Sequence, residues 1–306
     1  MARMKRLVFS LAFVSSVLGT ACTRTPPAGA TSDPSPPSTP LTPSPTSEPT
    51  PLAPTASSPR TVVPAAGGGK LVGPSGAADW NALPQGEKDR IKGLPILYLH
   101  QSVGQDLEDG SEANGFKFEY FGPQSTTLVN GPNGGIFTDV GNVPNGEPFK
   151  KMDVVRRSLK VTKNAAKVVS FSFGYADVRD EDLAKVSAEY QKLVAEVKAS
   201  GARFVHITPP LVYSVAENPP KQKLRDFMLK TFKDDIIFDL QDVESLDAGK
   251  RCQEGGVWRI CQANRSTTAC PSKGQGIDGD GAGHLCERKA KDIAKGLLYA
   301  FYLASR

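Results

Sequence analysis

Five short apolar segments, separated by polar or helix-like stretches, constrain the fold of this chain most strongly. Each is too short for a typical helix and is rich in β-branched and aromatic residues, which indicates buried strands. The segments are Ile96–His100, Phe116–Phe121, Val168–Phe173, Arg203–Thr208 and Asp235–Leu240. Strands that are largely apolar and alternate with amphipathic helices are typical of a parallel sheet covered on both faces. The sequence therefore predicts an α/β domain.

Three amphipathic segments provide the helices of this prediction. The clearest covers Asp180–Ser200, where the apolar residues fall on one face and Gly201 follows as a stop signal. The other two cover Lys221–Lys233 and Cys286–Ala304. Because ligands of parallel sheets bind beyond the carboxyl ends of the strands, polar residues that follow the strands are the first candidates for a site.

The first 21 residues have the pattern of an export signal peptide. Three basic residues precede the apolar run LVFSLAFVSSVLG, which is too short for a spanning helix and ends in small residues before Cys22. The sequence LGTAC resembles a bacterial lipobox, in which the cysteine receives lipid. Ordinary cleavage after Ala21 is the alternative, since Gly19 and Ala21 are both small. We expect an exported lipoprotein, anchored in the bacterial cell envelope through Cys22 and facing the periplasm or the cell surface.

Residues 22–66 form a linker of unusual composition. This segment consists mostly of Pro, Thr, Ser and Ala, lacks aromatic residues, and holds 13 of the 25 prolines, so it cannot bury a core. We expect a disordered, extended tether between the lipid and a folded domain at residues 67–306. An unselected low-complexity leader is the alternative. Removal of the three basic signal residues lowers the formal charge from +5 to +2, and no basic run remains to predict a nucleic-acid partner.

Four cysteines besides Cys22 lie in the last fifth of the chain. They are Cys252, Cys261, Cys270 and Cys286. An even number in an exported chain predicts two disulfides, with three pairings open. Their spacings lack the Cys-x-x-Cys pairs of structural zinc sites, which favours disulfides over a metal. Because all four border the segment that contains His284, we expect the disulfides to fix that segment.

Three polar segments could supply chemistry. HQSVG (100–104) follows the first predicted strand and contains Ser102, FGYAD (173–177) follows the third, and GIDGDGAGHLCE (276–287) contains His284. A serine hydroxyl is a weak nucleophile until a base takes its proton, and a histidine steered by a carboxylate is the usual base. The glycine-rich DGDGAG lacks the full ligand spacing of a calcium loop. Structural alternatives are Ser102 as a helix cap and His284 as a helix-entry residue.

These segments resemble the sequence blocks of the SGNH (GDSL-like) hydrolases. HQSVG corresponds to the first block, VGNVPNGEPFKK (140–151) to the second, GYAD (174–177) to the third and DGAGH (280–284) to the last. A bacterial lipoprotein subgroup with HxSxG at the first block is similar also at ITPPL (207–211) and FDLQDVES (238–245). The resemblance implies a three-layer α/β/α sandwich with a flavodoxin-like parallel sheet.

The resemblance also implies residue roles. Ser102 would be the nucleophile, His284 the base, and Asp280 the acid, with Asp278 as the second candidate. The oxyanion hole would be formed by the Ser102 amide and Gly141, with Asn145 as an additional donor. Asp177 and Gln101 would contact substrate, although Asp177 could instead cap the helix that follows it.

The chain departs from the family pattern at three places. His100-Gln101 replaces the usual Gly-Asp before the serine, Ala176 replaces an asparagine, and Asp280 precedes His284 by four residues rather than three. We expect a cofactor-free, metal-free serine ester hydrolase, an esterase that removes acetyl or other acyl groups from a small molecule or an envelope glycan. A catalytically inactive glycan- or protein-binding lipoprotein is the alternative, and a structural envelope lipoprotein is the third.

Overall fold

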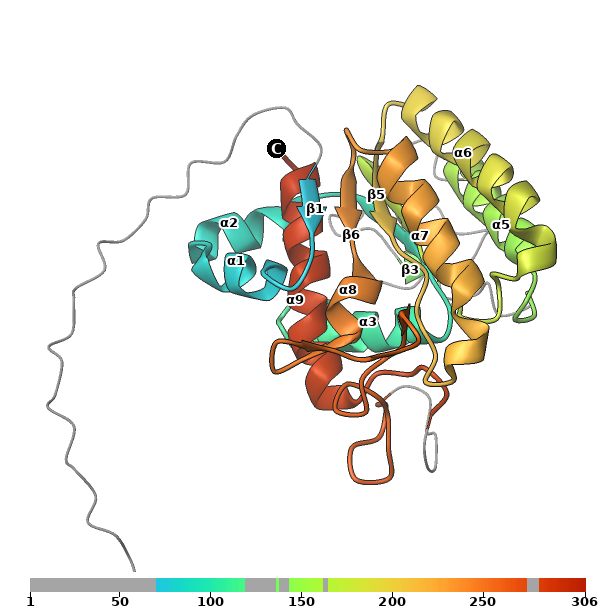
Figure 1. The fold of residues 1–306 in the computed structure, drawn as a ribbon. Coiled ribbons are helices and arrows are strands. Elements are labelled where there is room, and N and C mark those ends of the chain that lie inside the picture. The colour runs from blue at the N-terminus through green and yellow to red at the C-terminus, as the bar shows by residue number, and fades with distance from the viewer. Residues whose placement is uncertain (1–69, 119–135, 138–142, 162–164, 274–280) are drawn as a thin grey trace, which may run out of the picture. The chain divides into compact units, whose positions relative to one another are not determined.

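A six-stranded sheet, parallel throughout, organises the protein (Figure 1). The computed structural model describes residues 70–118, 136–137, 143–161, 165–273 and 281–306. The strand order is β1-β6-β5-β4-β2-β3. The strands are β1 Lys70–Val72, β2 Ile96–Leu99, β3 Ile136–Phe137, β4 Val168–Phe171, β5 Arg203–Ile207 and β6 Ile236–Phe238.

The strand order places a topological switch point beside β2. From β2 the chain forms β3 on one side, returns to β4 on the other side, and continues outward to β5 and β6. This is the flavodoxin-like order, to which β1 adds one further edge strand. Loops that leave β2 and β4 therefore diverge at the carboxyl edge of the sheet, where a ligand site is expected.

Helices cover both faces of the sheet (Figure 1). The helices are α1 Gly76–Ala82, α2 Gln85–Arg90, α3 Val103–Glu112, α5 Pro148–Val161, α6 Leu183–Ala199, α7 Pro219–Thr231, α8 Leu240–Glu244 and α9 Glu287–Ala304, with short 3₁₀ turns at Ile91–Gly93, Asp180–Asp182 and Val215–Glu217. Leu97 and Leu99 pack with α5, α6 and α7, whereas Ile96 and Tyr98 pack with α1, α3 and α9. Alternate residues of one strand thus enter two different cores, which makes the fold a three-layer sandwich.

The strand predictions are confirmed at four of the five segments. The exception is Phe116–Phe121, whose described part, Phe116–Phe118, is not a strand. Phe116 and Phe118 are both buried and meet edge to face at 4.6 Å, and Phe118 also packs against Tyr98 and Phe301. Alternating aromatic residues here fill the core from a loop, so their spacing imitates a strand. The edge strand β3 was not predicted.

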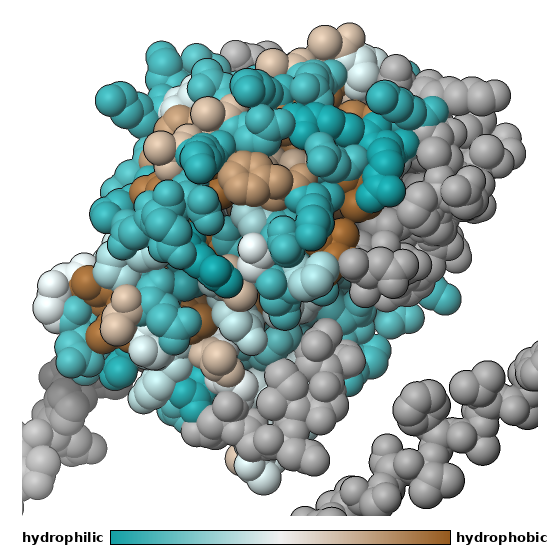
Figure 2. Space-filling view, turned by 90° about the vertical axis from the view of Figure 1, so that its right-hand side faces the viewer, coloured by the Kyte–Doolittle hydropathy of each residue, from teal (hydrophilic) through white to brown (hydrophobic). Residues whose placement is uncertain are grey.

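The three predicted helices are present. The segment at 180–200 begins with a 3₁₀ turn before α6. Helix α7 starts at Pro219, two residues before the predicted start, because proline is favourable in the first turn. No helix among the described residues is long and apolar enough to span a membrane. The face drawn in Figure 2 is mainly hydrophilic, with small, separate hydrophobic patches.

Two small antiparallel hairpins lie between α8 and α9. Leu246–Asp247 (β7) pairs with Lys250–Arg251 (β8), and Gln253–Glu254 (β9) pairs with Val257–Trp258 (β10). The described residues between β10 and α9, 259–273 and 281–286, contain no helix or named strand. This C-terminal region carries His284 to the carboxyl edge of the sheet.

Candidate active site

Ser102 occupies a sharp turn between strand β2 and helix α3. Its backbone has φ 60° and ψ −119°, a conformation that residues with a side chain rarely adopt. A Cβ atom on Gly104 would lie 2.3 Å from Cβ of His100, so the turn requires glycine there. The HxSxG spacing therefore has a physical cause. A strained strand-to-helix turn of this kind is a known way to display a nucleophilic serine.

Ser102 and His284 are brought into contact by the fold. The Oγ atom of Ser102 lies 3.0 Å from Nε2 of His284, although the two residues are 182 positions apart. Their exposed fractions are 8% and 4%. The hydroxyl and the imidazole are thus within hydrogen-bond distance and largely shielded from water, which is the geometry that base activation of a serine requires.

The carboxylate at the other side of the imidazole belongs to Asp106. Its Oδ2 lies 2.9 Å from Nδ1 of His284 and also accepts the backbone N–H of Leu285 at 2.9 Å. Its Oδ1 accepts a hydrogen bond from the hydroxyl of Ser272. Asp106 is 1% exposed. Three donors therefore fix the orientation of a buried carboxylate, which in turn fixes the ring of His284.

The position of Asp106 differs from the sequence prediction. Asp280, the expected acid, and Asp278, the second candidate, lie outside the described residues, and Nδ1 of His284 is occupied by Asp106. Asp106 follows Ser102 by four residues and lies in the first turn of α3, whose N-cap is Ser102, so the two residues are close along the chain. The signal that could have found it is a Ser-x-x-x-Asp spacing at a strand-to-helix boundary.

The segment that carries His284 is fixed by backbone contacts and by a disulfide. Cys270–Cys286 joins the segment that contains Ser272 to the one that contains His284. The carbonyl of His284 accepts the N–H of Ser266 at 2.6 Å. A Cβ atom on Gly283 would lie 2.4 Å from the carbonyl oxygen of Leu211, so only glycine fits this close approach.

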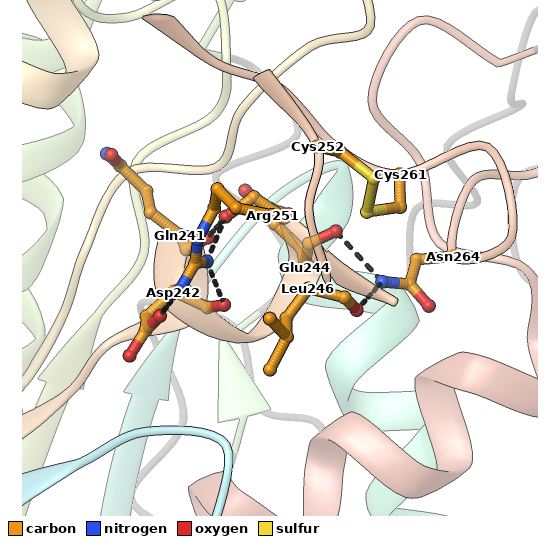
Figure 3. The surroundings of a disulfide bond; sticks show 9 residues. Gln241, Asp242, Glu244, Leu246, Arg251, Cys252, Cys261 and Asn264 are labelled. Atoms are coloured by element: carbon orange, nitrogen blue, oxygen red, sulfur yellow. Dashed lines mark hydrogen bonds and ion pairs between the residues drawn. A yellow bond between two sulfur atoms is a disulfide. The ribbon is translucent and has the colours of Figure 1, made fainter. Parts of the chain in front are cut away.

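The second disulfide, Cys252–Cys261, stabilises a different loop (Figure 3). Beside it, Nδ2 of Asn264 donates to the carbonyls of Glu244 and Leu246 at 2.9 and 3.0 Å. All four cysteines are thus paired as disulfides, which removes the zinc alternative for them. Of the two bonds, Cys270–Cys286 alone brackets the His284 segment directly. Disulfides of this kind indicate that the domain matures outside the reducing cytoplasm.

The predicted oxyanion residues are only partly described. Gly141 lies outside the described residues. Asn145 is exposed, and its Oδ1 lies 3.7 Å from the position that a Cβ on Gly174 would take. Gln101 donates from Nε2 to the carbonyl of Val143 at 3.3 Å. The loops around Asn145, Gly174 and Ser102 are therefore neighbours at one edge of the sheet.

Asp177 is turned into the protein and has no surface at the site. Its side chain is fully buried, and its carboxylate accepts hydrogen bonds from the backbone N–H groups of Gly146 and Gly174 and from Nζ of Lys151. It does not cap the following helix, because Arg179 and Asp182 occupy the cap positions of the 3₁₀ turn and of α6. The substrate contact expected of Asp177 is therefore not supported by its position.

Tyr175 is a neighbour of the site that the sequence did not reveal. Its half-buried ring meets the ring of His284 edge-on, with centroids 6.0 Å apart. Tyr175 lies in the GYAD segment, between the third predicted strand and Asp177. No residue pattern marks it, because a tyrosine after a strand is more often part of the core.

The two other histidines have structural partners. His100 lies 3.1 Å from Oε2 of Glu108, and both side chains are buried. His206 lies between the hydroxyl of Tyr190 and the carboxylate of Asp235, and burial lowers its pKa. None of these contacts involves Ser102, His284 or Asp106.

The described residues contain no group of three or more metal-ligating side chains. The described site consists of a serine, a histidine and a carboxylate in a hydrogen-bonded series. No family model and no curated protein sequence matches this chain.

Proposed function

We propose that this protein is an exported serine ester hydrolase of the SGNH type, with Ser102, His284 and Asp106 as its catalytic triad. One observation carries the proposal: Ser102 Oγ, the two nitrogens of His284 and Asp106 Oδ2 form one hydrogen-bonded series with distances of 3.0 and 2.9 Å. The strained turn at Ser102 and the location beside the switch point of the sheet support it.

The mechanism would be a double displacement. Ser102 Oγ attacks the ester carbonyl carbon while Nε2 of His284 takes the hydroxyl proton, and Asp106 stabilises the resulting imidazolium. The tetrahedral intermediate then releases the alcohol, which receives that proton, and an acyl-serine remains. Water attacks the acyl-serine with His284 again as the base, which releases the acid and restores Ser102.

The oxyanion formed at each step needs hydrogen-bond donors. The proposed donors are the Ser102 amide, Gly141 and the side chain of Asn145. Loss of one such donor costs roughly 3 to 4 kcal/mol of transition-state stabilisation in a serine protease. The side-chain amide of Asn145 would matter here, because Ala176 cannot supply the donor that the family places at that position.

The proposed cellular setting follows from the N-terminal segment. Lipid on Cys22 would anchor the chain, and residues 22–66 would hold the domain away from the membrane as a tether. A substrate within reach of such an enzyme would be an acylated glycan of the envelope or an acylated small molecule. The two disulfides are consistent with this address.

A second candidate function is a catalytically inactive binding module with the same fold. Ala176 favours it, because the asparagine that helps to stabilise the oxyanion in the family is missing there. Such a module would use the same edge of the sheet to hold a glycan or a partner protein.

Hydrolysis of short-chain p-nitrophenyl esters distinguishes the two functions. The exported protein would carry Cys22→Ser, which prevents lipidation, and would be compared with the same protein carrying Ser102→Ala. We expect Ser102→Ala to lower kcat/KM at least about 1,000-fold, as for other triads. Equal rates in the two proteins, or no hydrolysis in either, would favour the binding module.

A further inference from the structure

A buried ion pair lies beneath the loops next to the candidate site. Nζ of Lys151, on α5, lies 2.6 Å from Oδ2 of Asp177, and the two side chains are 1% and 0% exposed. Burial of two charges is unfavourable unless the pair has good geometry and further hydrogen bonds. A buried ion pair does not by itself indicate a stabilising role. The role of this pair is therefore inferred from the other contacts of the Asp177 carboxylate.

The carboxylate of Asp177 joins two loops that come from different elements. Oδ1 accepts the N–H of Gly146, in the loop before α5, at 2.9 Å. Oδ2 accepts the N–H of Gly174, in the loop after β4, at 2.6 Å. Asp177 thus accepts hydrogen bonds from backbone donors of both loops at once. The negative charge of its carboxylate makes these hydrogen bonds strong, and the positive charge of Lys151 balances it.

Both loops adjoin functional residues of the proposed site. Asn145 directly precedes Gly146, and its Oδ1 lies close to Gly174. Tyr175 directly follows Gly174, and its ring contacts the ring of His284. Gln101, next to Ser102, donates to the carbonyl of Val143 in the first of these loops. A shift of either loop would therefore move groups that adjoin Ser102 and His284.

We propose that Lys151 and Asp177 form a positioning pair that sets the Val143–Gly146 and Gly174–Asp177 loops against Ser102. The inference rests on the proposed hydrolase function and deepens it. Neither residue would touch the substrate. The pair would hold the side-chain amide of Asn145 where the oxyanion forms, in a chain whose Ala176 leaves that side of the site with one donor fewer.

Three variants test this role: Asp177→Asn, Lys151→Met and the double variant. We expect each single variant to lower kcat about 10- to 100-fold with little change in KM, since small displacements of catalytic groups cost about this much. Binding of an alkyl boronic acid, which forms a tetrahedral adduct with serine, should weaken in parallel with kcat. All rates are referred to active sites titrated with a fluorophosphonate.

The double variant separates positioning from stability. Removal of both charges leaves no unpaired buried charge, so the midpoint of thermal unfolding should recover toward the parent value. A positioning role predicts that kcat stays low in the double variant, because the bonds to Gly146 and Gly174 remain weakened. Recovery of kcat together with thermal stability would overturn the inference.

Asp239→Asn is the matched control. Asp239 is also fully buried and paired with an arginine, Arg225, at 2.6 Å, but it follows β6, two strands away from β4. We expect Asp239→Asn to lower thermal stability without lowering kcat per titrated site. An equal loss of kcat in Asp239→Asn and Asp177→Asn would also overturn the inference. Failure of the proposed function itself would appear separately, as parent activity that Ser102→Ala does not change.

Discussion

The two halves of the candidate site are built in different ways. Ser102 is the N-cap of α3 and Asp106 lies in the first turn of that helix, so their relative position follows from local backbone geometry. His284 comes from residues 281–286, which the structure describes as irregular backbone before α9 and which are fixed by a disulfide, by Ser266 and by Asp106. The serine and acid are thus placed by secondary structure, whereas the base is placed by long-range contacts. The placement of His284 should therefore depend on the Cys270–Cys286 disulfide more than the placement of Ser102 and Asp106 does.

Replacement of the acid has the largest expected effect on activity. Asp106→Asn keeps the size of the side chain but removes the charge that stabilises the imidazolium and selects the tautomer of His284. We expect kcat to fall by about 10³- to 10⁴-fold, as for the equivalent change in serine proteases. Ester hydrolysis rates at titrated sites measure the loss.

Asp280→Asn is the control for this prediction. Because Asp106 occupies Nδ1 of His284, loss of the Asp280 carboxylate should change kcat by less than about threefold. A large loss in Asp280→Asn with a small one in Asp106→Asn would restore the acid expected from the sequence and contradict the assignment of Asp106.

Removal of a disulfide has the next largest expected effect. Cys270→Ser with Cys286→Ser opens a loop closed over a sequence separation of 16, which should lower the free energy of unfolding by about 3 kcal/mol. It should also lower kcat, since His284 and Ser272 lie within two residues of these cysteines. Chemical unfolding and ester hydrolysis measure the two effects.

The other disulfide offers a direct comparison. Cys252→Ser with Cys261→Ser opens a shorter loop with a sequence separation of 9 and should lower stability by a similar amount, about 2 to 3 kcal/mol. Because that bond stabilises a different loop, kcat per folded molecule should stay near the parent value. Equal losses of kcat in the Cys270/Cys286 and Cys252/Cys261 double variants would show that His284 has no specific dependence on the Cys270–Cys286 disulfide.

The smallest expected effect concerns the strained turn at Ser102. Glycine adopts φ 60° and ψ −119° without the steric cost that a side chain imposes. Both Ser102→Gly and Ser102→Ala should be inactive. We expect the free energy of unfolding to be about 1 kcal/mol higher for the glycine variant than for the alanine variant. Urea denaturation of the two variants measures the difference. A less stable glycine variant would mean that the turn is not strained.

Much of the fold was predictable because its strands are short apolar runs and its long helices are amphipathic. The segments at 96–100, 168–173, 203–208 and 235–240 each contain a strand of the sheet. Ser102 and His284 were also predicted as a pair. Ser102 follows the predicted strand at 96–100 and His284 precedes the predicted helix at 286–304, which places both at the carboxyl edge of the sheet. These features depend on local pattern and on the topology of parallel sheets.

Other features depend on contacts that no local pattern reveals. Helix α3 contains two glycines, a serine and two aspartates, which are weak helix formers, so it was not predicted as a helix and Asp106 in its first turn was not recognised. The aromatic residues at 116–118 imitate a strand because burial of alternate residues also occurs in loops. The pairing of the cysteines and the Lys151–Asp177 pair join segments far apart in the sequence and required the structure.

Covalent labelling tests the central claim most directly. A fluorophosphonate loses fluoride to an activated serine and leaves a phosphonate ester on Oγ, with the hydroxyl proton taken by the neighbouring base. We predict a single adduct, found by peptide mass spectrometry on Ser102, with a labelling rate that His284→Ala lowers at least about 100-fold. No adduct in the folded protein, an adduct at another residue, or labelling of Ser102 that is unchanged by His284→Ala would contradict the account.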